Sequence, residues 1–186
     1  ATYARICTVA NGLFFDTGFN SVTMEQIAKA AGIRRSTLYL HFRDKDAILA
    51  AIAKDYSAKL RVVIALLPEP EPTRREIEKW VEEFAEFVSR ERAATELLVS
   101  LSHMQNAPPA ALAFGQELIQ MMAERLAAFR HALEPGQPLA LAWALSTLDG
   151  LGWALCHYAR DVNGELAKHR LTVATATLNR FVRGKL

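Results

Sequence analysis

Residues 23–42 constrain the fold of this chain more than any other segment, because they predict two short helices joined by a sharp turn. Thr23 can cap the first helix, and Gln26, three residues later, completes a capping box. Gly32 can adopt the left-handed conformation that ends a helix and turns the chain. This pattern is typical of a helix-turn-helix, whose second helix enters the major groove of DNA. DNA is therefore the leading candidate partner.

The second of these helices opens with two arginines, Arg34 and Arg35. Cations at the positive end of the helix dipole should cost about 0.3–1 kcal/mol in an isolated helix. Contact with phosphate explains them better, because the cations and the free N-terminal amides then converge on the same DNA backbone. An ordinary helical hairpin with a solvated basic face is the alternative interpretation.

The run from Thr23 to Lys45 resembles the TetR family, the tetracycline-repressor-like transcription regulators. Upstream, Ala10–Phe14 and Gly18-Phe19 resemble the first helix of that family and the loop after it. Beyond Leu49 the chain matches the family only in length and helical character. The residues that carry the resemblance are Ala31-Gly32-Ile33, Ser36-Thr37-Leu38-Tyr39-Leu40-His41-Phe42 and Asp44-Lys45-Asp46-Ala47-Ile48-Leu49.

The resemblance implies a role for each matching position. Thr23 and Lys45 would touch phosphates, Tyr39 and His41 would reach phosphates on either side, and the start of the recognition helix would face the groove. Two positions depart from the family pattern. Arg34 replaces a small polar cap and suggests an added phosphate or guanine contact, whereas Leu40 could meet a thymine methyl group or could be a lost contact. The predicted DNA-binding residues are Thr23, Arg34, Arg35, Ser36, Thr37, Tyr39, Leu40, His41 and Lys45.

Charge is distributed in agreement with a DNA-binding head at the N-terminus. Residues 1–45 hold six Lys or Arg against three Asp or Glu, whereas the remainder holds sixteen against seventeen. The excess is small, so binding would depend on placed contacts more than on a broad field. The two cysteines predict no disulfide framework and favour a reducing cytoplasm. We expect no cofactor and no metal site. No signal-peptide pattern opens the sequence given. The sequence does not tell whether a basic N-terminal arm precedes Ala1.

The rest of the sequence predicts helices almost throughout, and therefore an all-α fold. A helix of about 24 residues, or about 36 Å, runs from Asp44 until Pro68 stops it. Residues 68–72 then predict a stiff, extended connector. Thr73 and Glu76 form a second capping box before a helix, and further helices are expected at 94–105, 109–133, 138–160 and 163–184. We expect a helix-turn-helix DNA-binding domain at 1–43 and, joined by the long helix, a larger ligand-binding and dimerisation domain at 44–186.

Residues 138–160 are apolar enough to suggest a membrane span, since Asp149 is their one charged residue before Arg160. A charge at the centre of a bilayer is costly, so a buried or interface helix of a soluble protein is favoured. The family resemblance implies a dimer built on the last two helices, which would place two recognition helices about 34–36 Å apart on a palindromic site. The predicted interface, half of which could instead be monomer core, consists of Trp143, Leu148, Leu151, Gly152, Leu155, Thr172, Thr175, Leu178 and Phe181.

The resemblance also implies a pocket for a small-molecule effector, which the apolar helices suggest is apolar or aromatic rather than phosphorylated. Plain core packing is the alternative for each wall residue. The polar candidates are His103, Gln105, Thr147 and His157. The predicted pocket residues are Trp80, Phe84, Phe87, Met104, Phe114, Met121, Met122, Thr147 and Trp153.

Catalysis has little support, because adjacent side chains such as Cys156 and His157 point about 100° apart on a helix. His157 and Asp161 are four residues apart, but two ligands make a weak metal site. The sequence therefore favours a ligand-responsive, homodimeric transcriptional regulator, most simply a repressor released from its operator by the effector. The alternative is a helical protein-interaction module whose helix-turn-helix no longer binds DNA.

Overall fold

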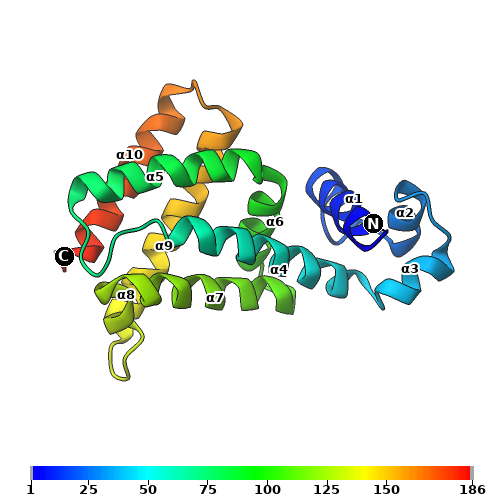
Figure 1. Ribbon diagram of the computed structural model, residues 1–186, viewed down its shortest axis with the longest axis horizontal. Coiled ribbons are helices and arrows are strands. Elements are labelled where there is room, and N and C mark those ends of the chain that lie inside the picture. Colours follow the sequence, from blue (N-terminus) through cyan, green and yellow to red (C-terminus); the bar gives the residue numbers. More distant parts are fainter. Residues whose placement is uncertain (1, 185–186) are drawn as a thin grey trace. The chain divides into compact units, whose positions relative to one another are not determined.

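The computed structural model describes residues 2–184, and the fold of these residues is all-α (Figure 1). The helices fall into two compact units, each with its own core. One unit comprises the chain up to Tyr56 together with residues 93–114, and the other comprises residues 57–92 and the chain from Gly115 onward. The helices are α1 (Thr2–Thr17), α2 (Met24–Ala30), α3 (Arg35–His41), α4 (Lys45–Ile64), α5 (Arg74–Arg90), α6 (Arg92–Ser102), α7 (Pro109–Arg125), α8 (Ala127–Ala132), α9 (Pro138–Arg160) and α10 (Glu165–Val182).

The first unit contains the predicted helix-turn-helix, in which α2 packs against both α1 and α3. The helix α2 turns a narrow apolar face inward, on which Ile27 and Ala28 are buried. Leu38 and Phe42 are buried as well, and they define the inward face of α3. This core lies beneath α3 and fixes which of its faces is left outside. The compact unit extends past residue 43, and a functional boundary at 43/44 stays a prediction.

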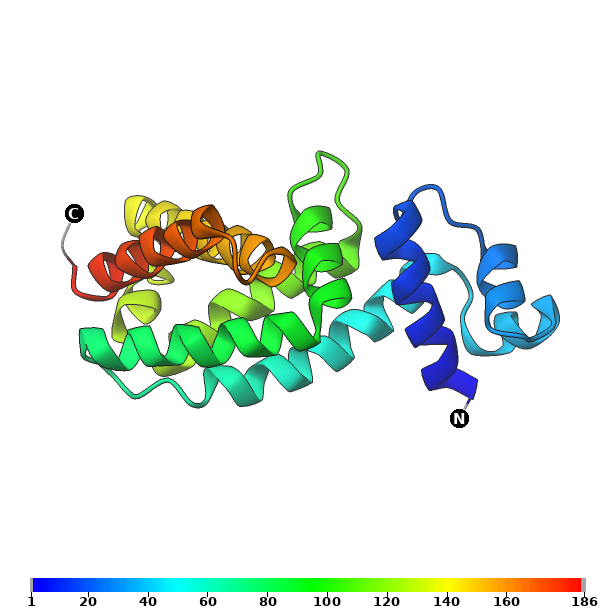
Figure 2. The ribbon, with the colours of Figure 1, turned by 90° about the horizontal axis from the view of Figure 1, so that it is seen from above.

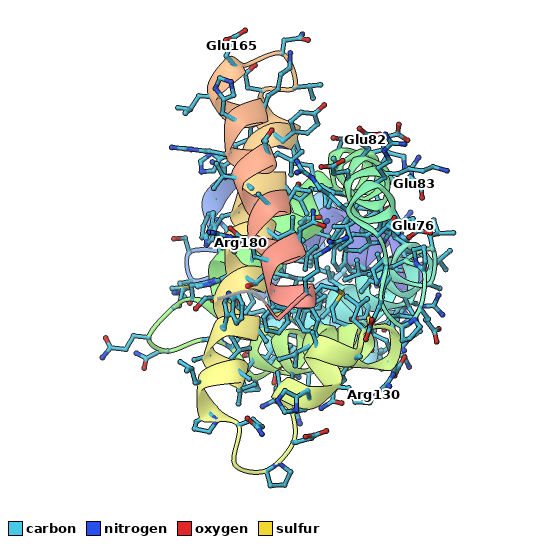
Figure 3. All side chains as sticks on the ribbon, turned by 90° about the vertical axis from the view of Figure 1, so that its left-hand side faces the viewer. Glu76, Glu82, Glu83, Arg130, Glu165 and Arg180 are labelled. Atoms are coloured by element: carbon cyan, nitrogen blue, oxygen red, sulfur yellow. The ribbon has the colours of Figure 1, made fainter. Side chains whose placement is uncertain are left out.

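The second unit is organised around α9, which packs against α5, α8 and α10. Figure 2 shows α9 and α10 side by side, and the turn at residues 161–164 joins them into a hairpin. At the far end of this hairpin the ring of Phe181 packs edge-on against Phe129 and Trp143, with ring centroids 4.7 and 5.0 Å apart. Figure 3 shows Glu165 and Arg180 towards the two ends of α10, and Glu82 on α5.

The helix α9 is long and apolar enough to cross a membrane by length and composition. Within an apolar stretch of 18 residues of α9, 39% is buried inside the structure, and core helices of soluble proteins can be equally long and apolar. Asp149, midway along α9, is exposed. Packing against three neighbouring helices accounts for the buried face of α9 without a bilayer.

Two predictions about secondary structure are wrong. The single helix expected at 109–133 is interrupted at Leu126, whose extended backbone (φ −113°, ψ 126°) separates α7 from α8. The backbone N–H of Ala127 donates instead to the carbonyl of Pro70, so a long-range hydrogen bond replaces a helical one. The connector at 68–72 is bent rather than extended, and Arg125 holds its start by donating to the Leu67 carbonyl (3.1 and 2.6 Å) and pairing with Glu69.

Candidate nucleic-acid interface

A reciprocal capping box sets the start of α2, as the sequence predicts. The Thr23 hydroxyl accepts from the backbone N–H of Gln26 (3.2 Å), and the Gln26 amide oxygen accepts from the backbone N–H of Thr23 (2.7 Å). The other end of α2 is closed by Gly32, whose φ of +62° reverses the chain and lets Ile33 N–H donate to the carbonyl of Ala28 (3.0 Å). These two devices fix the angle at which α3 leaves the turn.

The helix α3 presents a mostly polar outer surface. Arg34, Arg35, Ser36, Tyr39, Leu40 and His41 are exposed, Thr37 is half-buried and Leu38 is buried. Arg34 stands at the N-cap position without a capping side-chain hydrogen bond. Arg34 therefore does not stabilise the start of α3 in the way that a small polar N-cap residue would. The exposed set includes most of the predicted DNA contacts.

Arg35 and Tyr39 form a pair one helical turn apart. The Arg35 guanidinium carbon lies 5.5 Å from the centroid of the Tyr39 ring, within the range of a cation–π contact. A side-chain hydrogen bond with Tyr39 raises the pKa of the exposed Arg35 guanidinium above its ordinary value. The pair thus holds a permanent cation and a phenol on the same side of α3, where both can reach a DNA backbone.

Tyr3, which the sequence did not single out, supports the other end of α3. Its ring centroid lies 4.8 Å from that of Phe42 and 6.5 Å from that of His41, and half of the residue is exposed. The contact ties the first turn of α1 to the C-terminal end of α3. No sequence signal could have found it, since Tyr3 is 38 positions from His41 and the pairing depends on how α1 crosses the head.

Lys45, predicted as a phosphate contact, is engaged inside the head. Its ammonium donates to the carbonyls of Phe19 (2.7 Å), Asn20 (3.0 Å) and Val22 (3.0 Å), and it lies 4.9 Å from the centroid of the Phe19 ring. An ammonium group has three N–H donors, so these carbonyls use all of them. In this arrangement Lys45 closes the loop between α1 and α2, and a phosphate contact stays a prediction that competes with this role.

The predicted pocket residues are divided between the two compact units. Phe114 packs in the first unit against Tyr56 with ring centroids 5.5 Å apart. Met104 and Trp153 are exposed, at 41% and 37%. The buried members in the second unit are Trp80, Phe84, Phe87, Met121, Met122 and Thr147. Trp80 donates from its indole N–H to the Val63 carbonyl (2.8 Å), which marks it as a satisfied core residue.

Two of the polar pocket candidates, His103 and Thr147, have hydrogen-bond partners on their own helical segments. Nδ1 of His103 lies 2.7 Å from the Val99 carbonyl, and the Thr147 hydroxyl donates to the Trp143 carbonyl (2.8 Å). Gln105 is exposed and His157 is half-buried. Among residues 2–184, no group of three or more His, Cys, Asp or Glu side chains is placed to hold a metal ion.

A groove with a volume of about 570 Å³ lies on the outer side of the α9–α10 hairpin. We call it the α9–α10 groove. Its walls combine small residues with a few large or basic side chains. It is lined by Ser146, Thr147, Gly150, Trp153, Ala154, His157, Leu166, His169, Arg170, Val173, Ala174 and Thr177.

None of the predicted dimer residues lines this groove. Trp143 and Gly152 are half-buried, and Thr172 is exposed. The others are covered by the packing of the chain itself, which makes them monomer core, as the alternative interpretation allowed. These are Leu148, Leu151, Leu155, Thr175, Leu178 and Phe181, each exposed by 8% or less.

Comparison with known proteins assigns the N-terminal segment. Residues 6–52 match the family described as bacterial regulatory proteins, tetR family. The chain is 41% identical over 51 residues to the HTH-type transcriptional regulator UidR of Escherichia coli K12, covering 27% of this chain and 26% of UidR. It is 32% identical over 59 residues to the HTH-type transcriptional repressor Rv1474c of Mycobacterium tuberculosis, covering 32% of each. The match thus spans about a quarter to a third of the curated relatives.

Solved structures match over nearly the whole chain and show the fold. A putative TetR-family regulator from Syntrophomonas wolfei has a TM-score of 0.73 at 16% identity, covering 100% of this chain and 96% of that one. A TetR-like regulator from Rhodococcus sp. RHA1 has a TM-score of 0.69 at 20% identity, with 99% and 97% covered. Thermus thermophilus FadR, a TetR-family repressor solved with lauroyl-CoA, has a TM-score of 0.58 at 24% identity, with 99% and 95% covered.

Proposed function

We propose that the chain is a TetR-family protein, a cytoplasmic, ligand-responsive transcriptional repressor that binds a palindromic operator as a homodimer, and the match of residues 6–52 to that family supports this. The observation that carries the proposal is the outer surface of α3, where Arg34, Arg35, Tyr39 and His41 are exposed around a buried Leu38. Cations and hydrogen-bonding groups in that arrangement suit the phosphates that border a major groove. An interaction module that no longer binds DNA is the less favoured alternative, since it leaves the arginines at the start of α3 unexplained.

A second copy of the chain is the proposed occupant of the α9–α10 groove. One recognition helix reads only a few base pairs, so a specific site requires two heads on one duplex. Leu145, Trp153, Leu166 and Val173 leave apolar surface exposed on this hairpin, at 43%, 37%, 65% and 65%. A two-fold pairing of the hairpin would cover that surface with its own copy. The proposed interface therefore consists of these exposed apolar residues rather than of the mostly buried residues expected from the sequence.

The proposed effector is a small apolar or aromatic molecule. The second unit buries several large side chains that can rearrange around such a ligand, among them Phe84, Met121 and Met122. A ligand that binds a conformation unsuited to the operator would weaken DNA binding by its differential affinity for the two states. FadR of Thermus thermophilus was solved with lauroyl-CoA, so acyl-CoA thioesters belong in the first test panel as the phosphorylated class with which free fatty and aromatic acids are compared.

The experiment that tests the proposal is selection of bound duplexes from a random DNA pool, followed by gel-shift titration at several salt concentrations. We expect palindromic sites and an affinity that falls as salt rises. Arg35→Ala should weaken binding, whereas Arg75→Ala, at an exposed arginine in the first turn of α5, is the matched control. Absence of any salt-sensitive binding would contradict the proposal and favour the interaction module.

The dimer is tested separately by sedimentation. Val173→Glu places a charge on the exposed side of α10 and should yield monomers that keep the helical content of the wild type. These monomers should bind the full palindrome far more weakly, because the two heads no longer share one binding event. A Val173→Glu protein that stays dimeric and binds normally would exclude the α9–α10 groove as the interface.

A further inference from the structure

Leu40 has the most exposed large apolar side chain in the described part of the chain, at 85%. It lies in the middle of a surface that is otherwise polar, between Tyr39 and His41. A single exposed leucine is common on protein surfaces, so exposure alone decides nothing. Its position on α3, the proposed recognition helix, is the reason to assign it a contact with DNA.

Helix geometry places Leu40 on the outward axis of α3. Successive residues turn by about 100°, so Ser36 and Leu40 lie within about 20° of the direction opposite Leu38. Leu38 is fully buried and defines the inward direction. By the same geometry Arg35 and Tyr39 lie on one flank of that axis, and Thr37 and His41 lie on the other. When α3 enters a groove, the two flanks face its phosphate walls and the Ser36–Leu40 axis faces the base edges.

The chemistry of the base edges then selects one partner for Leu40. A leucine side chain forms no hydrogen bond. If it covered a polar base atom, that atom would lose its hydrogen bond to water without gaining another, which is unfavourable. Thymine alone among the four bases carries an apolar group, the C5 methyl, on its major-groove edge. We propose that Leu40 reads the C5 methyl group of a thymine in each half-site of the operator. The inference rests on the proposed function and adds one base preference to it.

The test uses the selected operator with each thymine of the half-site replaced in turn by deoxyuridine, which removes the methyl group and leaves pairing intact. For the wild type, one thymine position should stand out, with a loss of affinity of about fourfold per half-site, the equivalent of about 0.8 kcal/mol for one buried methyl group. For Leu40→Ala, replacement at that same position should change affinity by less than twofold, in the manner of an uncontacted base.

Two further variants keep the test decisive. Leu112→Ala, at a leucine exposed by 51% on α7, should keep the full uracil penalty and serves as the matched control. Leu40→Gln should lose the penalty, and its circular dichroism should match that of the wild type because the site is exposed. Retention of every uracil penalty in Leu40→Ala would overturn the inference while leaving DNA binding intact. Absence of DNA binding in the wild type would instead defeat the proposed function itself.

Discussion

Replacing Lys45 with methionine separates two roles for this residue, a bond that holds the head together and a contact with DNA. Methionine keeps most of the aliphatic stem and removes the ammonium group. The carbonyls of Phe19, Asn20 and Val22 then lose a donor at 2.7, 3.0 and 3.0 Å. If the ammonium is a structural tie, the loop between α1 and α2 should loosen and the free energy of unfolding should fall.

The size of the effect follows from which carbonyls water can reach. The bond to Asn20 is exposed, so water replaces it, whereas those to Phe19 and Val22 are part-buried. Two charge-assisted hydrogen bonds from one shared ammonium, together with the contact to the Phe19 ring, should contribute about 2–4 kcal/mol. For a chain of this size, that loss corresponds to a fall in Tm of about 5–15 °C.

Thermal unfolding followed by circular dichroism measures this effect, and gel shift at several salt concentrations measures DNA binding. Lys54→Met, at an exposed lysine on the same helix, is the matched control and should change Tm little. The reasoning is refuted if Lys45→Met leaves Tm unchanged and instead lowers DNA affinity with a salt slope reduced by about one, the signature of a lost phosphate contact.

Three further predictions concern stability. Trp80→Phe removes the donor to the buried Val63 carbonyl and should cost about 1–3 kcal/mol in urea denaturation, and an unchanged midpoint would argue against a core role. Leu178→Ala, at a fully buried position of α10, should cost about 2–5 kcal/mol, whereas loss of dimerisation at unchanged stability would restore it as an interface residue. Hydrogen bonds from the Thr73 backbone and hydroxyl lower the pKa of Glu76 below its ordinary value of 4.5. The stability advantage of the wild type over Glu76→Ala should therefore be complete above pH 4.5 and vanish as the pH falls through the lowered pKa, and an advantage independent of pH would contradict this cause.

Much of the local structure could be predicted because its causes lie within a few residues of one another. The capping boxes at Thr23 and Thr73 both form, and the helix expected at 138–160 begins and ends at those residues. Side-chain oxygens three residues from the amides they accept from, and a proline at the first helical position, act wherever the rest of the chain goes. The same holds for Gly32, whose positive φ is a property of the turn alone.

The failures have long-range causes. The break at Leu126 accompanies a hydrogen bond from Ala127 to Pro70, a residue 57 positions earlier that no helical pattern could reveal. The sequence predicts interface residues on both α9 and α10 but leaves open which of them the chain itself covers. A helix that is apolar all round gives no preferred face, so the sequence could not say which side the chain itself would cover.

The sequence by itself therefore determined that two helices meet at Gly32, that α3 begins with cations, and that α9 is long and apolar. Each follows from residue type and spacing alone. Tertiary structure decided where the Lys45 ammonium points, that Leu40 lies on the outward axis of the head, and which side of α9 stays open beside α10. These three features depend on which surfaces become buried. Helices that are distant in the sequence bury those surfaces only when they pack together.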